Sequence, residues 1–71
     1  MSTVKGFWQH ENGKIYAVES DSFGRIIAGA GPIDPQNLAD PEDYHYRTAI
    51  LDWLLRAFAD GKLHRISLKK S

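Results

Sequence analysis

The sequence predicts an α+β domain in which a three-stranded antiparallel sheet, connected as a meander, is followed by one long helix. Three observations support this fold class: an Asn-Gly pair between two apolar-rich segments, a connector with two prolines over residues 31–39, and an amphipathic pattern over residues 40–60. Asn-Gly is the strongest short-range signal for a hairpin. Apolar residues that recur every three or four positions indicate a helix.

The first hairpin is predicted to join strands at residues 5–11 and 14–20 through a turn at Asn12-Gly13. A type I′ turn requires positive φ at both central residues, and Asn-Gly adopts that conformation at low cost. The turn also determines the register of the two strands. The expected cross-strand pairs are Glu11–Lys14, His10–Ile15, Gln9–Tyr16, Trp8–Ala17 and Phe7–Val18.

A second, four-residue loop over Asp21 to Gly24 is expected to lead into a third strand from Arg25 to about Ala30. It would place Glu19 opposite Ile26 and Val18 opposite Ile27. Side chains alternate across a sheet, so each face collects every second residue of a strand. One face is expected to hold Phe7, Gln9, Tyr16, Val18, Ile27 and Gly29, and the other Trp8, His10, Ile15, Ala17, Glu19, Ile26, Ala28 and Ala30.

Both of these faces are partly apolar, so we expect something besides the helix to cover the sheet. The bulk of Phe7, Val18 and Ile27 predicts that the helix packs on their side. The connector over 31–39 contains prolines that oppose regular strand pairing, and it should cross from the sheet to the helix.

The helix is expected to begin at Asp40 and to end near Asp60, with Gly61 as a left-handed stop. Proline at the first helical position and acidic residues in the first turn support this start. The helix carries two apolar stripes, more than one three-stranded sheet needs. The first contains Tyr44, Leu51, Leu54, Leu55 and Phe58, and the second contains Tyr46, Ile50, Trp53 and Ala57.

Residues 63–68 are expected to form a short fourth strand, with His64, Ile66 and Leu68 on one side, pairing with the free edge of the first strand. The alternative is a shorter docked strand before a frayed basic end. In either case we expect residues 69–71 to be a frayed basic end.

The composition predicts one small domain over residues 1–71 that needs reinforcement. A chain of 71 residues buries only about 60% of its unfolded surface. Because cysteine is absent, disulfides are excluded and most zinc sites are disfavoured, so self-association is the reinforcement we expect. The chain has no segment as long as a signal peptide or a membrane span, so we expect a cytoplasmic protein that does not bind membranes.

The candidate sites predict a homodimeric, non-enzymatic protein-interaction module with no catalytic residue, cofactor or metal. Glu42 and His45 have the spacing of one metal-ligand pair on a helix, but one pair is too few for a site. A sheet face around Trp8 is expected to contact an unidentified protein partner, although Trp8 could instead pack on Ala17 and Ala28 as ordinary core. Its residues are Trp8, His10, Glu19 and Ile26. The predicted oligomer interface is the second helix stripe, Tyr46, Ile50, Trp53 and Ala57, although the same residues could instead complete the core against Ile33 and Leu38 of the connector.

Nucleic-acid binding is the alternative function. The outline over residues 5–60 resembles sheet-reading DNA-binding domains, whose outward sheet face carries several cationic residues. Here the basic charge is concentrated at the C-terminal end, in Lys62, Arg65, Lys69 and Lys70. Nine acidic and nine basic residues give a net charge of zero, which disfavours this alternative.

Overall fold

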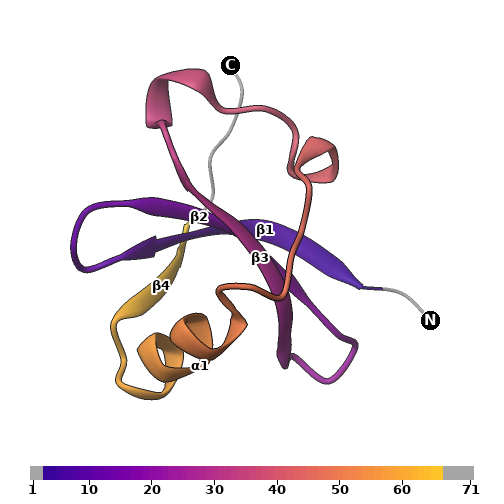
Figure 1. The fold of residues 1–71 in the computed structure, drawn as a ribbon, viewed down its shortest axis with the longest axis vertical. Coiled ribbons are helices and arrows are strands. Elements are labelled where there is room, and N and C mark those ends of the chain that lie inside the picture. The colour runs from indigo at the N-terminus through magenta and orange to yellow at the C-terminus, as the bar shows by residue number, and fades with distance from the viewer. Residues whose placement is uncertain (1–2, 67–71) are drawn as a thin grey trace.

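The computed structural model describes residues 3–66 and shows an α+β fold whose antiparallel sheet has four strands in the order β3-β2-β1-β4 (Figure 1). The strands are β1 (Val4–His10), β2 (Ile15–Ser20), β3 (Ile26–Ile33) and β4 (Leu63–Ile66). The described residues also contain the helix α1 (Leu51–Ala59) and two 3-10 turns, η1 (Pro35–Asn37) and η2 (Pro41–Asp43). None of these helices is long and apolar enough to cross a membrane.

The turn between β1 and β2 is a three-residue loop, so the prediction of a type I′ turn is wrong. His10 N donates to the Lys14 carbonyl and Gly13 N donates to the His10 carbonyl, both at 2.9 Å. Gly13 has a φ of +90°, whereas Asn12 does not have positive φ, as in a type I turn closed by a glycine bulge. The Asn12 side-chain oxygen instead accepts a hydrogen bond from Lys14 N at 2.8 Å. The register therefore shifts by one residue, giving the pairs Gln9–Ile15, Trp8–Tyr16, Phe7–Ala17 and Gly6–Val18.

This shift corrects the predicted sheet faces, because directly paired residues lie on the same face. Trp8 now shares a face with Tyr16 and Val18, and α1 packs on this face. The predicted helix-facing side is therefore right for Val18 but wrong for Phe7, which lies on the opposite face. The buried cluster here contains Tyr16, Val18, Ile26, Leu54, Ala57 and Leu63. The opposite cluster contains Phe7, Ile15 and Ala17 and is covered by the end of β3 and by the chain between β3 and α1, notably by Ile33, Leu38, Tyr44 and Tyr46. The expectation that something besides the helix covers the sheet is confirmed.

The second hairpin also has a shorter loop than predicted. Asp21 N donates to the Arg25 carbonyl at 2.9 Å, and Gly24 has a φ of +85°. A register shift follows between Ser20 and Glu19, where β3 has one extra residue, so the predicted pairs Glu19–Ile26 and Val18–Ile27 are wrong. The observed pairs are Ser20–Ile26, Glu19–Ala28 and Val18–Gly29.

Asp21 organises this second turn and should titrate at unusually low pH. Its carboxylate accepts hydrogen bonds from the backbone N–H groups of Arg25 and Phe23, each at 2.9 Å, and from Arg25 Nε at 3.0 Å. The Arg25 backbone bond is the largest cause that lowers the pKa of Asp21 below its ordinary value of 3.8. A lowered pKa means that the ionised carboxylate stabilises the fold above the unfolded-state pKa, and that this contribution is lost as pH falls through the folded-state pKa. Carboxyl-carbon NMR should give a midpoint for Asp21 below 3.8, and a midpoint at or above 3.8 would contradict the turn geometry.

The predicted helix over residues 40–60 is correct only in its second half. Asp40 does cap a helical turn, since its side chain accepts a hydrogen bond from Glu42 N at 2.9 Å, but that turn is η2 and ends at Asp43. The chain then extends, and Arg47 exchanges two backbone hydrogen bonds of 2.9 and 3.0 Å with Gly29 on the outer edge of β3. Tyrosine, histidine and threonine are weak helix formers, so the tertiary contacts of residues 44–48 override the cap signal.

The two tyrosines of the extended segment help to close the second sheet face. The Tyr44 ring meets the Phe7 ring edge-on, with centroids 5.8 Å apart. The Tyr46 hydroxyl donates to the Pro41 carbonyl at 2.6 Å. Burial is the main cause that raises the pKa of Tyr46 to about 12, followed by the negative charge of Glu42. The Tyr46 hydroxyl therefore keeps its proton, and with it this hydrogen bond, across the neutral range.

The end of α1 and the strand after it are close to prediction. Gly61 has a φ of +72° and its N–H donates to the Phe58 carbonyl at 3.1 Å, while Lys62 N donates to the Ala57 carbonyl at 2.9 Å. These two bonds form a Schellman motif, which confirms Gly61 as the helix stop. β4 pairs antiparallel with β1, as expected, and Ile66 joins the second cluster. Leu68 and residues 69–71 lie outside the described residues.

The connector begins later than predicted, because β3 continues through Ile33, which pairs with Ile15. Residues 31–33 therefore belong to the sheet despite Pro32. Gly31 has a φ of +145°, and a Cβ on it would lie 2.6 Å from Tyr16 Cδ2, so this bend requires a glycine.

Candidate interaction surface

One side of α1 belongs to the core. Leu54 is fully buried and Ala57 is buried, while Ile50 and Leu51 are half-buried against the same cluster. Leu54 reaches the backbone of β3 at Gly29, where any added Cβ would overlap the Leu54 Cδ1 atom. The absence of a side chain at Gly29 thus lets the helix approach the sheet closely. This contact sets how α1 is rotated about its axis.

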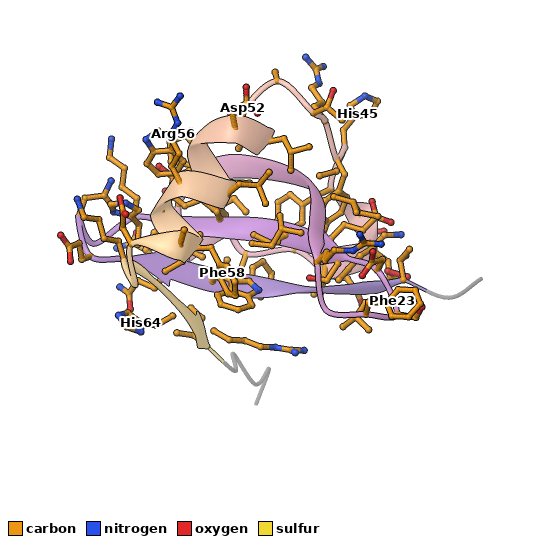
Figure 2. All side chains as sticks on the ribbon, turned by 90° about the horizontal axis from the view of Figure 1, so that it is seen from below. Phe23, His45, Asp52, Arg56, Phe58 and His64 are labelled. Carbon is orange, nitrogen blue, oxygen red and sulfur yellow. The ribbon has the colours of Figure 1, made fainter. Side chains whose placement is uncertain are left out.

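The rotation leaves three large apolar side chains of α1 in contact with solvent. Trp53 and Leu55 are each 41% exposed and Phe58 is 48% exposed. We call these three residues the α1 surface. Asp52 and Arg56 point outward from the same helix, while Phe58 lies on the side nearer β1 (Figure 2). Soluble monomers expose single apolar residues routinely, and three on one nine-residue helix make α1 a candidate contact surface.

Aromatic contacts hold the edges of the α1 surface in place. The Trp53 ring stacks on His10, with centroids 4.8 Å apart and an interplanar angle of 22°, and also packs against Tyr16 at 5.1 Å. The Phe58 ring meets Trp8 edge-on at 5.7 Å. A binding partner would therefore meet side chains with restricted rotamers, which lowers the entropic cost of contact.

The four predicted partner-binding residues do not form one surface. Trp8 and His10 lie beneath α1, half-buried by Phe58 and Trp53. Ile26 is buried in the same cluster. Glu19 pairs with Lys5 on the opposite sheet face, and its carboxylate accepts a hydrogen bond from Thr3 Oγ1 at 2.8 Å. The premise that these residues share a face depended on the wrong register.

The predicted oligomer interface is likewise divided. Ile50 and Ala57 pack against the core, but in the cluster under α1 and not against Ile33 and Leu38. Only Tyr46 joins the cluster of Ile33 and Leu38, on the far side of the sheet. Trp53 alone of the four is an exposed α1 side chain. Sequence reasoning missed Leu55 and Phe58 because it assigned both to the core stripe. The signal that could have found them is Ala57, whose small side chain suits close packing on a sheet face that already holds Trp8 and Tyr16.

Lys62 and Arg65 are exposed, as the nucleic-acid alternative requires, while Lys69 and Lys70 lie outside the described residues. Within residues 3–66, however, both sheet faces are covered, one by α1 and the other by the chain between β3 and α1. The described part of the fold thus lacks the outward sheet face that sheet-reading DNA-binding domains use.

The Glu42 and His45 pair does not lie on one helical turn, because the chain is extended after η2. Glu42 instead forms an ion pair with Lys5, at 3.5 Å between Oε2 and Nζ. Among the described residues, no group of three or more histidine, aspartate or glutamate side chains is placed to hold a metal ion.

No protein-family model, curated protein or solved structure matches this chain.

Proposed function

We propose that this chain is a non-catalytic protein-interaction module that self-associates through the α1 surface. The observation that carries the proposal is the exposure of Trp53, Leu55 and Phe58 on one short helix, where they flank the Leu54 and Ala57 side that packs on the core. A domain of this size without disulfides gains stability when a second copy covers such residues.

The size of the surface predicts a weak dimer. Large apolar side chains that are 41–48% exposed leave roughly 200–300 Å² of apolar area for the three residues together. A standard interface buries about 800 Å² on each partner. Contact with neighbouring polar residues would enlarge the buried area, but the apolar centre is small. We therefore expect a dissociation constant on the order of 100 µM.

The charges on α1 favour a second copy of the chain as the partner. Asp52 and Arg56 are exposed one turn apart on the same face of α1, and Leu55 lies between them in the sequence. Within the described structure they form no ion pair with each other. In a two-fold antiparallel arrangement of two α1 helices, Asp52 of one copy lies opposite Arg56 of the other. The outer side of the helix is thus complementary in charge to itself.

Sedimentation equilibrium from about 10 µM to about 1 mM tests this proposal. The apparent mass of the wild-type chain should rise above 8.0 kDa with concentration, and Leu55→Glu should hold it near 8.0 kDa by placing a carboxylate in the apolar contact. Phe23→Glu is the matched control, since Phe23 is 82% exposed at the β2–β3 turn, away from α1 (Figure 2). A wild-type mass that stays at 8.0 kDa, or equal effects of the two variants, would contradict the proposal.

A further inference from the structure

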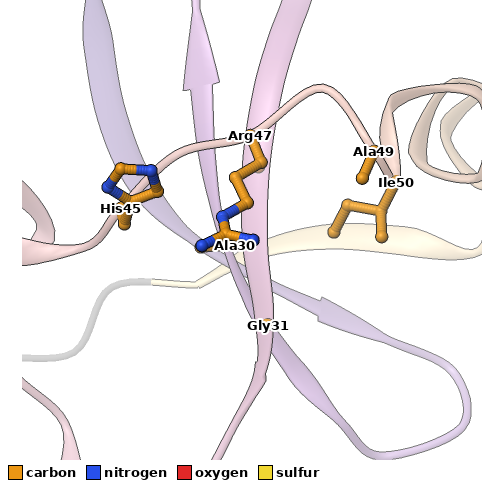
Figure 3. Close-up of a pocket in the computed structure, with 7 residues that line it drawn as sticks. Ala30, Gly31, His45, Arg47, Ala49 and Ile50 are labelled. Carbon is orange, nitrogen blue, oxygen red and sulfur yellow. The ribbon is translucent and has the colours of Figure 1, made fainter.

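A shallow hollow of about 350 Å³ lies at the outer edge of β3, apart from the α1 surface. Its floor is the small-residue segment Gly29–Gly31, and its walls come from the chain that leads into α1, at His45, Arg47, Ala49 and Ile50. Figure 3 shows Arg47 between His45 on one side and Ile50 on the other. Neither the α1 surface nor the core uses the side chains of Arg47 and His45.

The charge of the hollow has one sign. Arg47 and His45 are both exposed, and no residue that the described structure places in the lining carries a carboxylate. Within residues 3–66, Arg47 takes part in no ion pair. An anionic ligand would therefore meet two nitrogen donor groups and no competing acid.

The position of the arginine is fixed by the backbone. Arg47 N donates to the Gly29 carbonyl at 3.0 Å, and Gly29 N donates to the Arg47 carbonyl at 2.9 Å. These two backbone hydrogen bonds hold the Cα of Arg47 at the edge of the sheet. The guanidinium group therefore loses less freedom on binding than it would on a free loop.

We propose that this hollow binds a small organic phosphate. The Arg47 guanidinium offers two parallel N–H groups that match two phosphate oxygens, and His45 supplies a further donor. The volume lies at the lower end of the range of small-molecule sites and exceeds what a bare phosphate fills. Ala30, Ala49 and Ile50 provide apolar lining for the organic part of the ligand.

Amide NMR with phenyl phosphate as the probe tests the proposal, with sodium chloride used to hold ionic strength constant. We expect saturable shifts at Gly29, Gly31 and Ala49, and weaker binding of inorganic phosphate. Arg47→Gln should weaken phenyl phosphate binding at least fivefold, because it removes the charged fork while leaving the backbone bonds to Gly29. Arg65→Gln is the matched control, since Arg65 is an exposed arginine on β4, the opposite edge strand.

Shifts that do not saturate, that centre on β4, or that respond equally to both arginine variants would overturn the proposal. So would inorganic phosphate binding as tightly as phenyl phosphate. Circular dichroism verifies that Arg47→Gln is folded. Ala49→Leu serves as a second variant that fills the hollow and keeps both Arg47 and His45: it should weaken binding at least fivefold, and unchanged affinity would overturn the proposal.

Discussion

Leu54→Ala is expected to lower the free energy of unfolding by about 3–5 kcal/mol, enough to leave much of the population unfolded at room temperature. Leu54 is fully buried between α1 and the sheet, and it is one of the two largest side chains with no exposed surface among the described residues. Truncating its side chain loses apolar burial and opens a cavity between the sheet and the nine-residue helix α1. Urea unfolding followed by circular dichroism measures the change.

Leu55→Ala is the matched control, because it is the same substitution one position along the same helix. Leu55 is 41% exposed, so the cost should stay below about 1 kcal/mol at concentrations where the chain is monomeric. Equal losses for the two variants, or a larger loss at Leu55, would mean that α1 is rotated differently on the sheet.

Gly29→Ala is expected to lower the free energy of unfolding by about 1–3 kcal/mol through overpacking. The new Cβ would overlap the Leu54 Cδ1 atom and lie 3.3 Å from the Ala17 carbonyl oxygen, so α1 would have to move outward. Gly6→Ala is the control in the adjacent region of the sheet, because its Cβ would meet only the Arg65 guanidinium, at 3.5 Å or beyond. That variant should change stability by less than about 0.5 kcal/mol.

A double-mutant cycle makes the second prediction specific to one contact. In the background of Leu54→Ala the overlapping methyl group is absent, so Gly29→Ala should cost much less than in the wild-type chain. Because Leu54→Ala alone is strongly destabilising, both unfolding curves are best recorded with a stabilising osmolyte present. Strictly additive effects would show that Gly29 and Leu54 do not meet.

Local signals in the sequence predicted the parts of the fold that depend on local chemistry. The α+β class, the two hairpins, the cap at Asp40, the stop at Gly61 and the pairing of β4 with β1 are all present. The hairpins, the cap and the stop follow from residue types with strong backbone preferences, such as a glycine at positive φ. The pairing of β4 with β1 is a long-range contact and followed instead from the free edge of the first strand. Asparagine prefers the left-handed conformation less strongly than glycine, so Asn12 did not determine the turn type. Its side chain accepts a backbone hydrogen bond, and its φ is not positive.

The parts that could not be predicted depend on contacts distant in sequence. One added loop residue, Glu11, moved every side chain of β1 relative to β2 and so changed which side chains of β1 face α1. The capped segment after Asp40 left the helix because Tyr44 and Tyr46 cover the second sheet face and Arg47 pairs with Gly29. The candidate site could not be predicted for the same reason, because the exposure of Leu55 and Phe58 depends on the rotation of α1 about its axis on the sheet.

The most direct test of the account is an amide NMR dilution series of the wild-type chain, recorded from about 1 mM to about 10 µM. If α1 is seated through Leu54 and Ala57 and self-associates through its outer side, the amides of Asp52, Leu55 and Phe58 should shift with concentration while those of the β2–β3 turn stay constant. Spectra that do not change across this range would show that the exposed apolar side chains of α1 do not pair, and would contradict the account.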